Sequence, residues 1–82
     1  MYYLYILQSR KDHRFYTGIT NDLVRRLKQH NAGQVRSTKN RRPFNIVHAE
    51  EYIDRIGARQ REKELKSYAG AREKLKILDK FK

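Results

Sequence analysis

The sequence contains no cysteine, only one proline and only four glycines in 82 residues. Without cysteine the protein can form no disulfide, thiolate zinc site or cysteine nucleophile, so its stability has to come from packing. Long apolar runs are missing as well. No stretch approaches the roughly 18 apolar residues that a membrane-spanning helix needs, and residues 1–7 are too short and too rich in tyrosine for a signal peptide. We therefore expect a cytoplasmic protein without membrane association.

Length and composition predict one domain with a small core. A chain of 82 residues buries only about 60% of its unfolded surface, which suits a single domain spanning residues 1–82. Hydrophobic residues make up 38% of the sequence and charged residues 35%, and the mean hydropathy is −1.02. The core must therefore be built from a few strands and helix faces.

Positive charge is the strongest global signal. Twenty Lys and Arg against nine Asp and Glu give a net charge of +11, and the pI is near 10.3. Residues 10–42 contain ten basic but only two acidic side chains. Clustered cations at such a pI are typical of phosphate binding, so the expected partner is DNA or, alternatively, RNA. The alternative is a basic surface that is exposed to solvent and has no functional partner. The uneven distribution of the cations along the sequence argues against this alternative.

Three apolar runs predict three strands, at residues 2–8, 15–20 and 44–52. The first run is continuous and aromatic, which favours a central strand that is buried on both faces. The first two runs are close enough to form a hairpin. Gly18 interrupts the second run, and a glycine inside a strand suggests that another backbone or a ligand comes close there.

Capping signals and apolar stripes predict three helices. Thr20 or Asn21 is the expected cap of the first helix and Gly33 its end, and Asp54 starts a second helix that runs to about residue 68. A last helix follows Gly70 and turns three residues inward: Ala71, Leu75 and Leu78. The predicted fold class is α/β of the α+β kind, a three-stranded antiparallel sheet flanked by three helices in the order β-β-α-β-α-α.

A few polar residues stand out from this framework. Tyr16 shares a strand face with the interrupting glycine. Arg26 and His30, four residues apart, lie side by side on the first helix. Glu62 falls in the apolar stripe of the second helix. No Gly-rich phosphate loop, metal-ligand histidine spacing or two-metal acidic cluster is present, so these four residues are the candidates for chemistry.

The order and spacing of these motifs resemble the GIY-YIG nuclease superfamily, in its UPF0213-like group of small single-domain proteins, over nearly the whole chain. The first motif stands here as Tyr3-Leu4-Tyr5 and the second as Tyr16-Thr17-Gly18. The stretch Ala58-Arg59-Gln60-Arg61-Glu62 matches the segment with the family's metal-binding glutamate. Tyr3 replaces the name-giving glycine and Thr17 an isoleucine, but neither change removes a chemical group.

The resemblance implies a role for each residue of the pattern. Glu62 would be the only protein ligand of a single divalent cation, Mg²⁺ or Mn²⁺, completed by water and the scissile phosphate. Arg26 would hold phosphate oxygens as negative charge grows on them. Tyr16 would act as general base, directly or through water, or would position the attacking water, and Tyr5 would orient that water or the other tyrosine. His30 would relay a proton or contact phosphate.

Each of these residues also has a purely structural interpretation. Glu62 would then form an ion pair with Arg26 in the interface between sheet and helix. Tyr5 and Tyr16 would pack in the core with their hydroxyls satisfied, and His30 would make a structural hydrogen bond.

The sequence therefore predicts a metal-dependent endonuclease of DNA, selective by analogy for branched, flapped or single-stranded DNA and acting in repair or processing. Its contacts should be mostly to phosphates, from cations on the first helix and in a mobile basic loop at residues 34–42: Arg25, Lys28, Arg36, Lys39, Arg41 and Arg42. The alternative is a non-catalytic DNA- or RNA-binding module, which would not need Glu62. A monomer is favoured, and a protein partner could direct it to its target.

Overall fold

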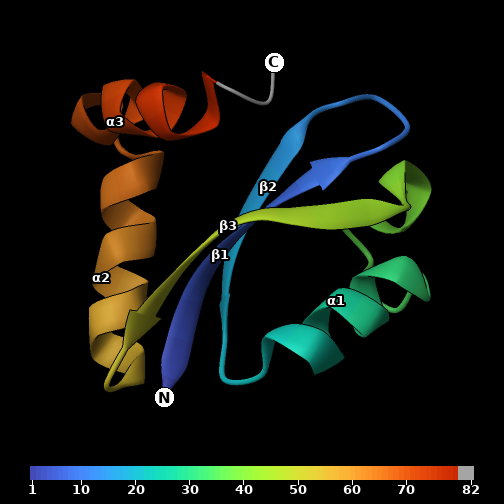
Figure 1. Ribbon diagram of the computed structural model, residues 1–82, viewed down its shortest axis with the longest axis horizontal. Helices are drawn as coiled ribbons and strands as arrows, with labels where there is room; N and C mark the ends of the chain where they lie inside the picture. The colour runs from blue at the N-terminus through green and yellow to red at the C-terminus, as the bar shows by residue number, and fades with distance from the viewer. Residues whose placement is uncertain (80–82) are drawn as a thin grey trace.

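The computed structural model describes residues 1–79, without the side chains of residues 68, 69 and 71. Three strands form an antiparallel sheet in the order β2-β1-β3: β1 (Tyr2–Ser9), β2 (Phe15–Thr20) and β3 (Phe44–Tyr52). Around it lie three helices and a 3₁₀ turn: α1 (Leu23–Asn31), η1 (Lys39–Arg41), α2 (Arg55–Lys66) and α3 (Tyr68–Leu78) (Figure 1). The predicted fold class and the order β-β-α-β-α-α are confirmed.

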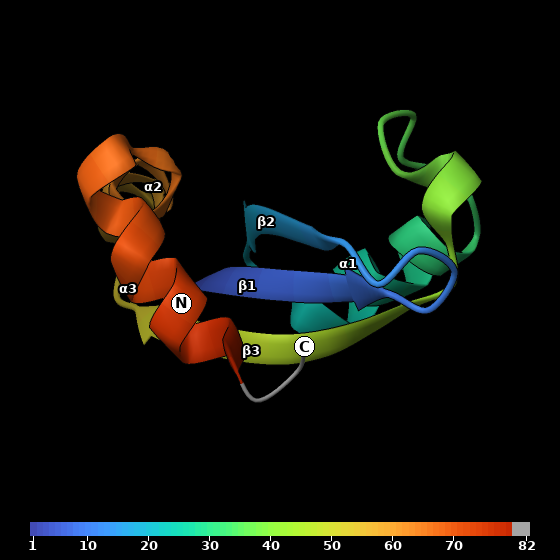
Figure 2. The same cartoon turned by 90° about the horizontal axis from the view of Figure 1, so that it is seen from above.

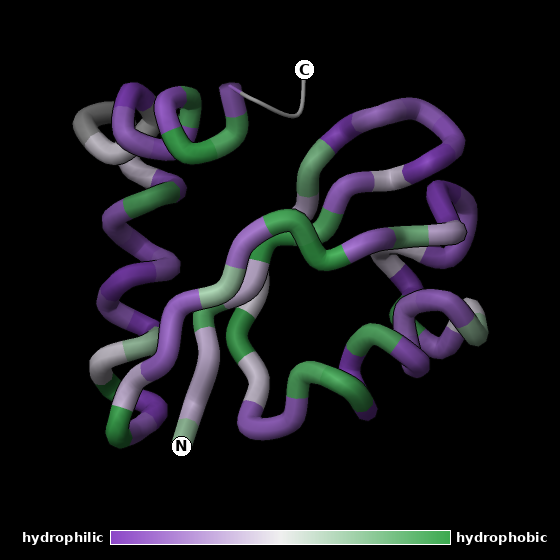
Figure 3. The backbone as a smooth tube through the Cα atoms, in the orientation of Figure 1, coloured by the Kyte–Doolittle hydropathy of each residue, from purple (hydrophilic) through white to green (hydrophobic). Residues whose placement is uncertain are grey.

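The central strand β1 divides a small core into two parts. Leu4 and Ile6 pack against α2 and α3, whereas Tyr5 and Leu7 face the side of the sheet that α1 covers. Figure 2 shows α2 and α3 on one side of the strands and α1 on the other. In Figure 3 the apolar colour is concentrated where the strands cross, and most of α2 is hydrophilic. Within the described residues, no helix has the length and apolarity to cross a membrane.

Of the two predicted ends of α1, the C-terminal end is correct and the N-terminal cap is wrong. Asp22 caps the helix, rather than Thr20 or Asn21, because its carboxylate accepts the N–H of residue 25 at 3.0 Å. The Thr20 hydroxyl instead accepts the N–H of Asp22 at 3.2 Å and so fixes the turn before the helix. Gly33 ends the helix as predicted. Its φ of +77° allows its own N–H and that of residue 34 to bond the carbonyls of residues 30 and 29.

A single residue separates α2 from α3. Asp54 caps α2 as predicted, but α2 ends at residue 66, where Ser67 becomes the cap of both helices. The predicted break at Gly70 is wrong, because Gly70 lies in the first turn of α3 and donates to the Ser67 hydroxyl at 3.0 Å. A Cβ atom at Gly70 would lie 1.7 Å from the carbonyl oxygen of Glu64. The glycine is needed for this close approach of the two helices.

The predicted inward face of the last helix is partly confirmed. Leu78 is buried in the core, but Leu75 is 52% exposed, so its predicted burial is wrong. The helix starts earlier than predicted, at residue 68, and Ile77 rather than Leu75 packs against the core. The side chain of Ala71 lies outside the described residues.

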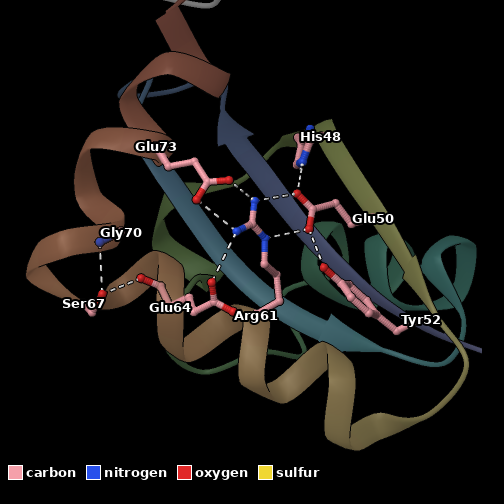
Figure 4. A network of polar contacts seen from close by, with 8 residues as sticks. All are labelled: His48, Glu50, Tyr52, Arg61, Glu64, Ser67, Gly70 and Glu73. Carbon is pink, nitrogen blue, oxygen red and sulfur yellow. Dashed lines mark hydrogen bonds and ion pairs between the residues drawn. The ribbon is translucent and has the colours of Figure 1, made fainter.

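One arginine joins β3 to both C-terminal helices. Arg61 of α2 contacts Glu50 of β3 at 2.8 Å and Glu73 of α3 at 2.6 Å (Figure 4). Burial by itself would raise the pKa of Glu50, but hydrogen bonds from Arg61, His48 and Tyr52 outweigh it and lower that pKa to about 2. This network holds α2 in one rotational setting, with the neighbouring Glu62 turned inward.

The segment predicted as a mobile basic loop is held at several points. Thr38 is fully buried, and the Ser9 hydroxyl donates to the carbonyl of Arg41 in η1. At the base of the segment, the Asn31 amide exchanges two hydrogen bonds with the backbone of Phe44, at 2.7 and 3.2 Å. The prediction of mobility is therefore wrong, because polar side chains that are not basic anchor the cations.

Replacing Thr17 with valine should stabilise the protein. The Thr17 side chain is 3% exposed, and its hydroxyl has no hydrogen-bond partner among residues 1–79. An apolar group of the same shape should remove that cost and raise the free energy of unfolding by about 1 kcal/mol, or Tm by about 4–8 °C. Thermal unfolding tests this. The matched control is Thr20→Val, which should destabilise because the Thr20 hydroxyl is hydrogen-bonded. Equal losses in both variants would contradict the interpretation.

Candidate functional site

A buried chain of hydrogen bonds connects three of the predicted site residues between β1 and α1. The Tyr5 hydroxyl lies 3.0 Å from His30 Nε2 and accepts from Arg26 Nε at 3.3 Å. On the other side of the ring, His30 Nδ1 lies 2.8 Å from the Thr38 hydroxyl, which donates to the carbonyl of Val35. A strand, a helix and the segment before η1 thus meet at one histidine.

The partners at the two ends set the direction of this chain. A guanidinium can only donate, so the Tyr5 oxygen accepts from Arg26 and sends its own proton to His30 Nε2. We therefore assign the His30 proton to Nδ1, which donates to Thr38. Burial, with a contribution from Arg26, lowers the pKa of His30 to about 4, and burial raises the pKa of Tyr5. Both groups are neutral at pH 7.

Gly18 allows the Tyr5 ring to lie across the hairpin. The two residues are partners in the β1–β2 register, and a Cβ atom at Gly18 would lie 2.6 Å from the Tyr5 hydroxyl oxygen. The close approach predicted from the glycine is therefore present, although a side chain makes it rather than a backbone or a ligand. The Tyr5 hydroxyl is carried in this way over the edge strand β2.

Tyr16 lies on the same face of the sheet but makes different contacts. Its ring is half-buried, with its centroid 5.2 Å from that of His30 and 6.5 Å from that of Tyr5. Within the described residues its hydroxyl has no hydrogen bond. The structural interpretation of a core tyrosine with a satisfied hydroxyl thus describes Tyr5 and not Tyr16. The Tyr16 hydroxyl is the one that remains available to water.

Glu62 is turned inward on α2, as predicted, and its side chain is only 8% exposed. Its Oε1 accepts from Arg59 at 2.6 Å and its Oε2 from Lys66 at 3.3 Å. The expected structural partner, Arg26, is wrong, since both carboxylate oxygens are paired within α2. The two partners are about half exposed and flexible, so they can move aside for a stronger ligand.

The donor set suits one hard cation. Burial is the main cause that raises the pKa of Tyr5, and the negative charge of Glu62 adds to it, so the carboxylate lies within electrostatic reach of the cluster. No group of three or more His, Cys, Asp and Glu residues gathers into a ligand set within residues 1–79. A single carboxylate completed by water would suit Mg²⁺ or Mn²⁺, because these ions keep several waters.

Five of the six cations predicted to contact nucleic acid are exposed on α1, on η1 and in the segments before and after η1: Arg25, Lys28, Arg36, Lys39 and Arg42. The sixth, Arg41, is half-buried and pairs with Asp12 at 3.3 Å. The Arg42 guanidinium lies over Gly33, where a Cβ atom would approach it to 2.5 Å. The cations are therefore displayed along one continuous stretch of chain next to α1.

Sequence reasoning missed the residues that hold the others in place. Thr38 stands within the basic segment, and no periodicity or motif marks it as a buried partner of His30. Gln29 accepts from Arg26 Nη1 at 3.0 Å and restrains its guanidinium. The position of Gln29, three residues after Arg26 on a helix, is the one signal that was available.

Comparison with known proteins gives matches over most of the chain. The family model for the GIY-YIG catalytic domain matches residues 1–76. A UPF0213 protein of Haloquadratum walsbyi is 43% identical over 82% of this chain and 75% of its own length. The UPF0213 protein YazA of Bacillus subtilis is 35% identical over 96% of this chain and 80% of its own length. The solution NMR structure of the UPF0213 protein BH0048 from Bacillus halodurans is 32% identical, with a TM-score of 0.54, over 94% of this chain and 85% of that one.

The burial of His30 should make stability depend on pH. The unfolded chain takes up a proton at His30 near pH 6.5, whereas the folded protein resists it down to about pH 4. Stability should therefore be complete above pH 6.5 and fall as the pH drops toward 4, by up to about 3 kcal/mol. Urea unfolding between pH 6.5 and about 5.5 measures this slope above the range in which Glu50 titrates, which starts near its ordinary pKa of 4.5 in the unfolded chain.

His30→Gln should lose that slope, and His13→Asn should keep it, because His13 is exposed in the loop between β1 and β2. Asparagine suits the positive φ of 62° at this position. A slope that persists in His30→Gln would show that another group is responsible.

Proposed function

Because the chain belongs to the GIY-YIG family, a nuclease superfamily whose members generally use divalent metals, we propose that it is a metal-dependent endonuclease that hydrolyses phosphodiester bonds in DNA. One observation carries the proposal. Within residues 1–79 a buried carboxylate, Glu62, is paired only with two exposed cations and lies in electrostatic reach of Tyr5, whose neighbour Tyr16 has a hydroxyl without a hydrogen bond. A scaffold that only bound phosphate would gain nothing from this buried negative charge.

The two tyrosines and the histidine have distinct roles in this proposal. His30 is neutral and fully buried, and both its ring nitrogens are bonded, so it serves to hold Tyr5 rather than to contact phosphate. Tyr5 has its proton directed at His30 and is unsuited to accept another. Tyr16 has the free hydroxyl and therefore positions the attacking water and takes part in its deprotonation.

Arg26 and Glu62 act on the phosphate. Arg26 uses Nε on Tyr5 and Nη1 on Gln29, which leaves its remaining donors for the non-bridging oxygens as charge grows on them. A divalent ion at Glu62 would polarise the phosphate and stabilise the leaving oxygen. With an ion at Glu62, Arg59 and Lys66 would be free to contact the phosphates on either side.

The distribution of charge supports contacts with the phosphates of the substrate, and the preferred DNA structure is inferred by analogy. The exposed cations on α1 and beyond it contact phosphates, so base sequence matters little. We infer that the enzyme acts on branched, flapped or single-stranded DNA in repair or processing, in the cytoplasm. It acts as a monomer, which a protein partner can direct to its target.

A second candidate is a non-catalytic DNA- or RNA-binding module. It is favoured by the two ion pairs of Glu62, since a carboxylate with a purely structural role would be paired in the same way. Binding would then depend steeply on salt and would be independent of metal.

Glu62→Gln separates the two candidates. It keeps the shape of the side chain but removes the charge, so metal-dependent cleavage should fall by at least about 100-fold while DNA binding persists. End-labelled single-stranded, duplex and branched DNA are incubated with Mg²⁺, Mn²⁺ or EDTA. The control is Glu51→Gln, an exposed glutamate of β3 whose side chain has no hydrogen bond or ion pair within residues 1–79, and this variant should cut normally. Cleavage that survives in EDTA or in Glu62→Gln would refute the proposed site, and binding without any cleavage would favour the second candidate.

Arg26→Ala and Arg25→Ala form a matched pair on α1. Loss of Arg26 should lower kcat by about 100- to 1,000-fold, because its contact grows in importance in the transition state. Loss of the exposed Arg25 should leave kcat unchanged and weaken binding, with a shallower dependence on salt. Single-turnover cleavage and binding curves measure both. Equal effects on kcat in the two variants would contradict a specific role for Arg26.

A further inference from the structure

A hollow of about 760 Å³ lies between the start of β2 and the two C-terminal helices, on the face of the sheet opposite Tyr16. Its apolar wall is made by Phe15 with leucines of α2 and α3, and its basic rim by Arg14, Lys66 and Lys74. Among the residues that the structure describes, no acidic side chain lines it. Its volume falls within the range of sites that hold small organic groups.

Lys74 indicates which charge a ligand of this hollow would carry. It is half-buried on α3, and within the described residues it has no ion pair or hydrogen bond. Burial, together with the nearby charge of Lys66, lowers its pKa. Two neighbouring cations above an apolar floor are a combination that an anionic ligand with a flat apolar part would stabilise.

Lys66 connects the hollow to the candidate metal ligand. Lys66 lines the hollow, and its ammonium lies 3.3 Å from the carboxylate of Glu62. The two residues are four apart on α2, or about 6 Å along the helix axis. A nucleic acid strand with one phosphate at Glu62 therefore has its next nucleotide at the opening of the hollow.

We propose that this hollow binds an unpaired base of the nucleic acid, stacked on Phe15, with the adjoining phosphate held by Lys74 and Arg14. The proposal rests on the proposed nuclease function and adds to it a structural basis for substrate choice. Phe15 and Tyr16 are consecutive in β2 and point to opposite faces of the sheet. A nucleic acid strand that contacts both residues therefore passes around the free edge of β2. A base in a duplex is paired and stacked and cannot enter, which selects single strands and flaps.

The test is equilibrium binding by fluorescence anisotropy, in EDTA so that metal-dependent cleavage does not interfere. The probes are a labelled single strand of about 12 nucleotides and a duplex of the same length. Phe15→Leu keeps the apolar wall but removes the aromatic ring, and Lys74→Gln removes a rim charge. The control is Lys76→Gln, an exposed residue of the same helix that does not line the hollow.

Phe15→Leu should weaken single-strand binding by about 5- to 30-fold and leave duplex binding within about 2-fold. Lys74→Gln should weaken single-strand binding and reduce its salt slope by about one. Lys76→Gln should affect both probes slightly and equally. Thermal unfolding shows whether Phe15→Leu is folded, and Lys74→Gln provides the test even if it is not.

Equal losses for strand and duplex, or no loss with either variant, would overturn the proposal and leave the hollow to another ligand, such as an acidic peptide. The result is independent of catalysis. Cleavage with unaltered binding in Phe15→Leu and Lys74→Gln would refute the base site but not the nuclease. Selective loss of single-strand binding without any cleavage would refute the nuclease but not the base site.

Discussion

The ion-pair network around Arg61 is the interaction on which the rest of the arrangement depends. Three of the nine acidic residues of the chain, Glu50, Glu64 and Glu73, surround this one side chain. They join a strand to α3 and to α2, a helix that is mostly hydrophilic. Because residue 61 is fixed toward the sheet, the next residue along α2, Glu62, can only point toward the edge of the sheet where β2 lies.

The use of acidic residues in structural contacts also explains the basic surface. Asp22 and Asp54 cap helices, and Asp12 pairs with Arg41. Most carboxylates are therefore committed to local structure, and few remain to neutralise the cations on α1 and the segment after it. Net charge here is a consequence of where the acidic residues are used as well as of how many there are.

The sequence predicted the framework well because the framework rests on local patterns. Strand periodicity, the Asp54 cap and Gly33 were correctly interpreted, and the Glu62 position followed from helical spacing. The errors have a common physical origin. Gly70 resembles a helix break in sequence, whereas its function is to admit the carbonyl of Glu64, a contact that only the three-dimensional arrangement reveals.

The site was predictable in its members but not in their connections. Tyr5, Arg26 and His30 were selected as residues, yet their hydrogen bonds depend on Thr38, which no pattern identifies. Buried polar partners of this kind come from distant segments, so their pairing is set by tertiary geometry. The partners of Glu62 were also missed, although Arg59 and Lys66 lie three and four residues away on the same helix, a spacing that brings side chains together.

The paired hydrogen bonds between Asn31 and Phe44 have an evolutionary consequence. They close the base of the intervening segment, so the end of α1 and the start of β3 stay together whatever the length of chain between them. Lengthening a closed surface segment costs little entropy. Insertions into the exposed part of this segment can therefore change the basic surface without disturbing His30.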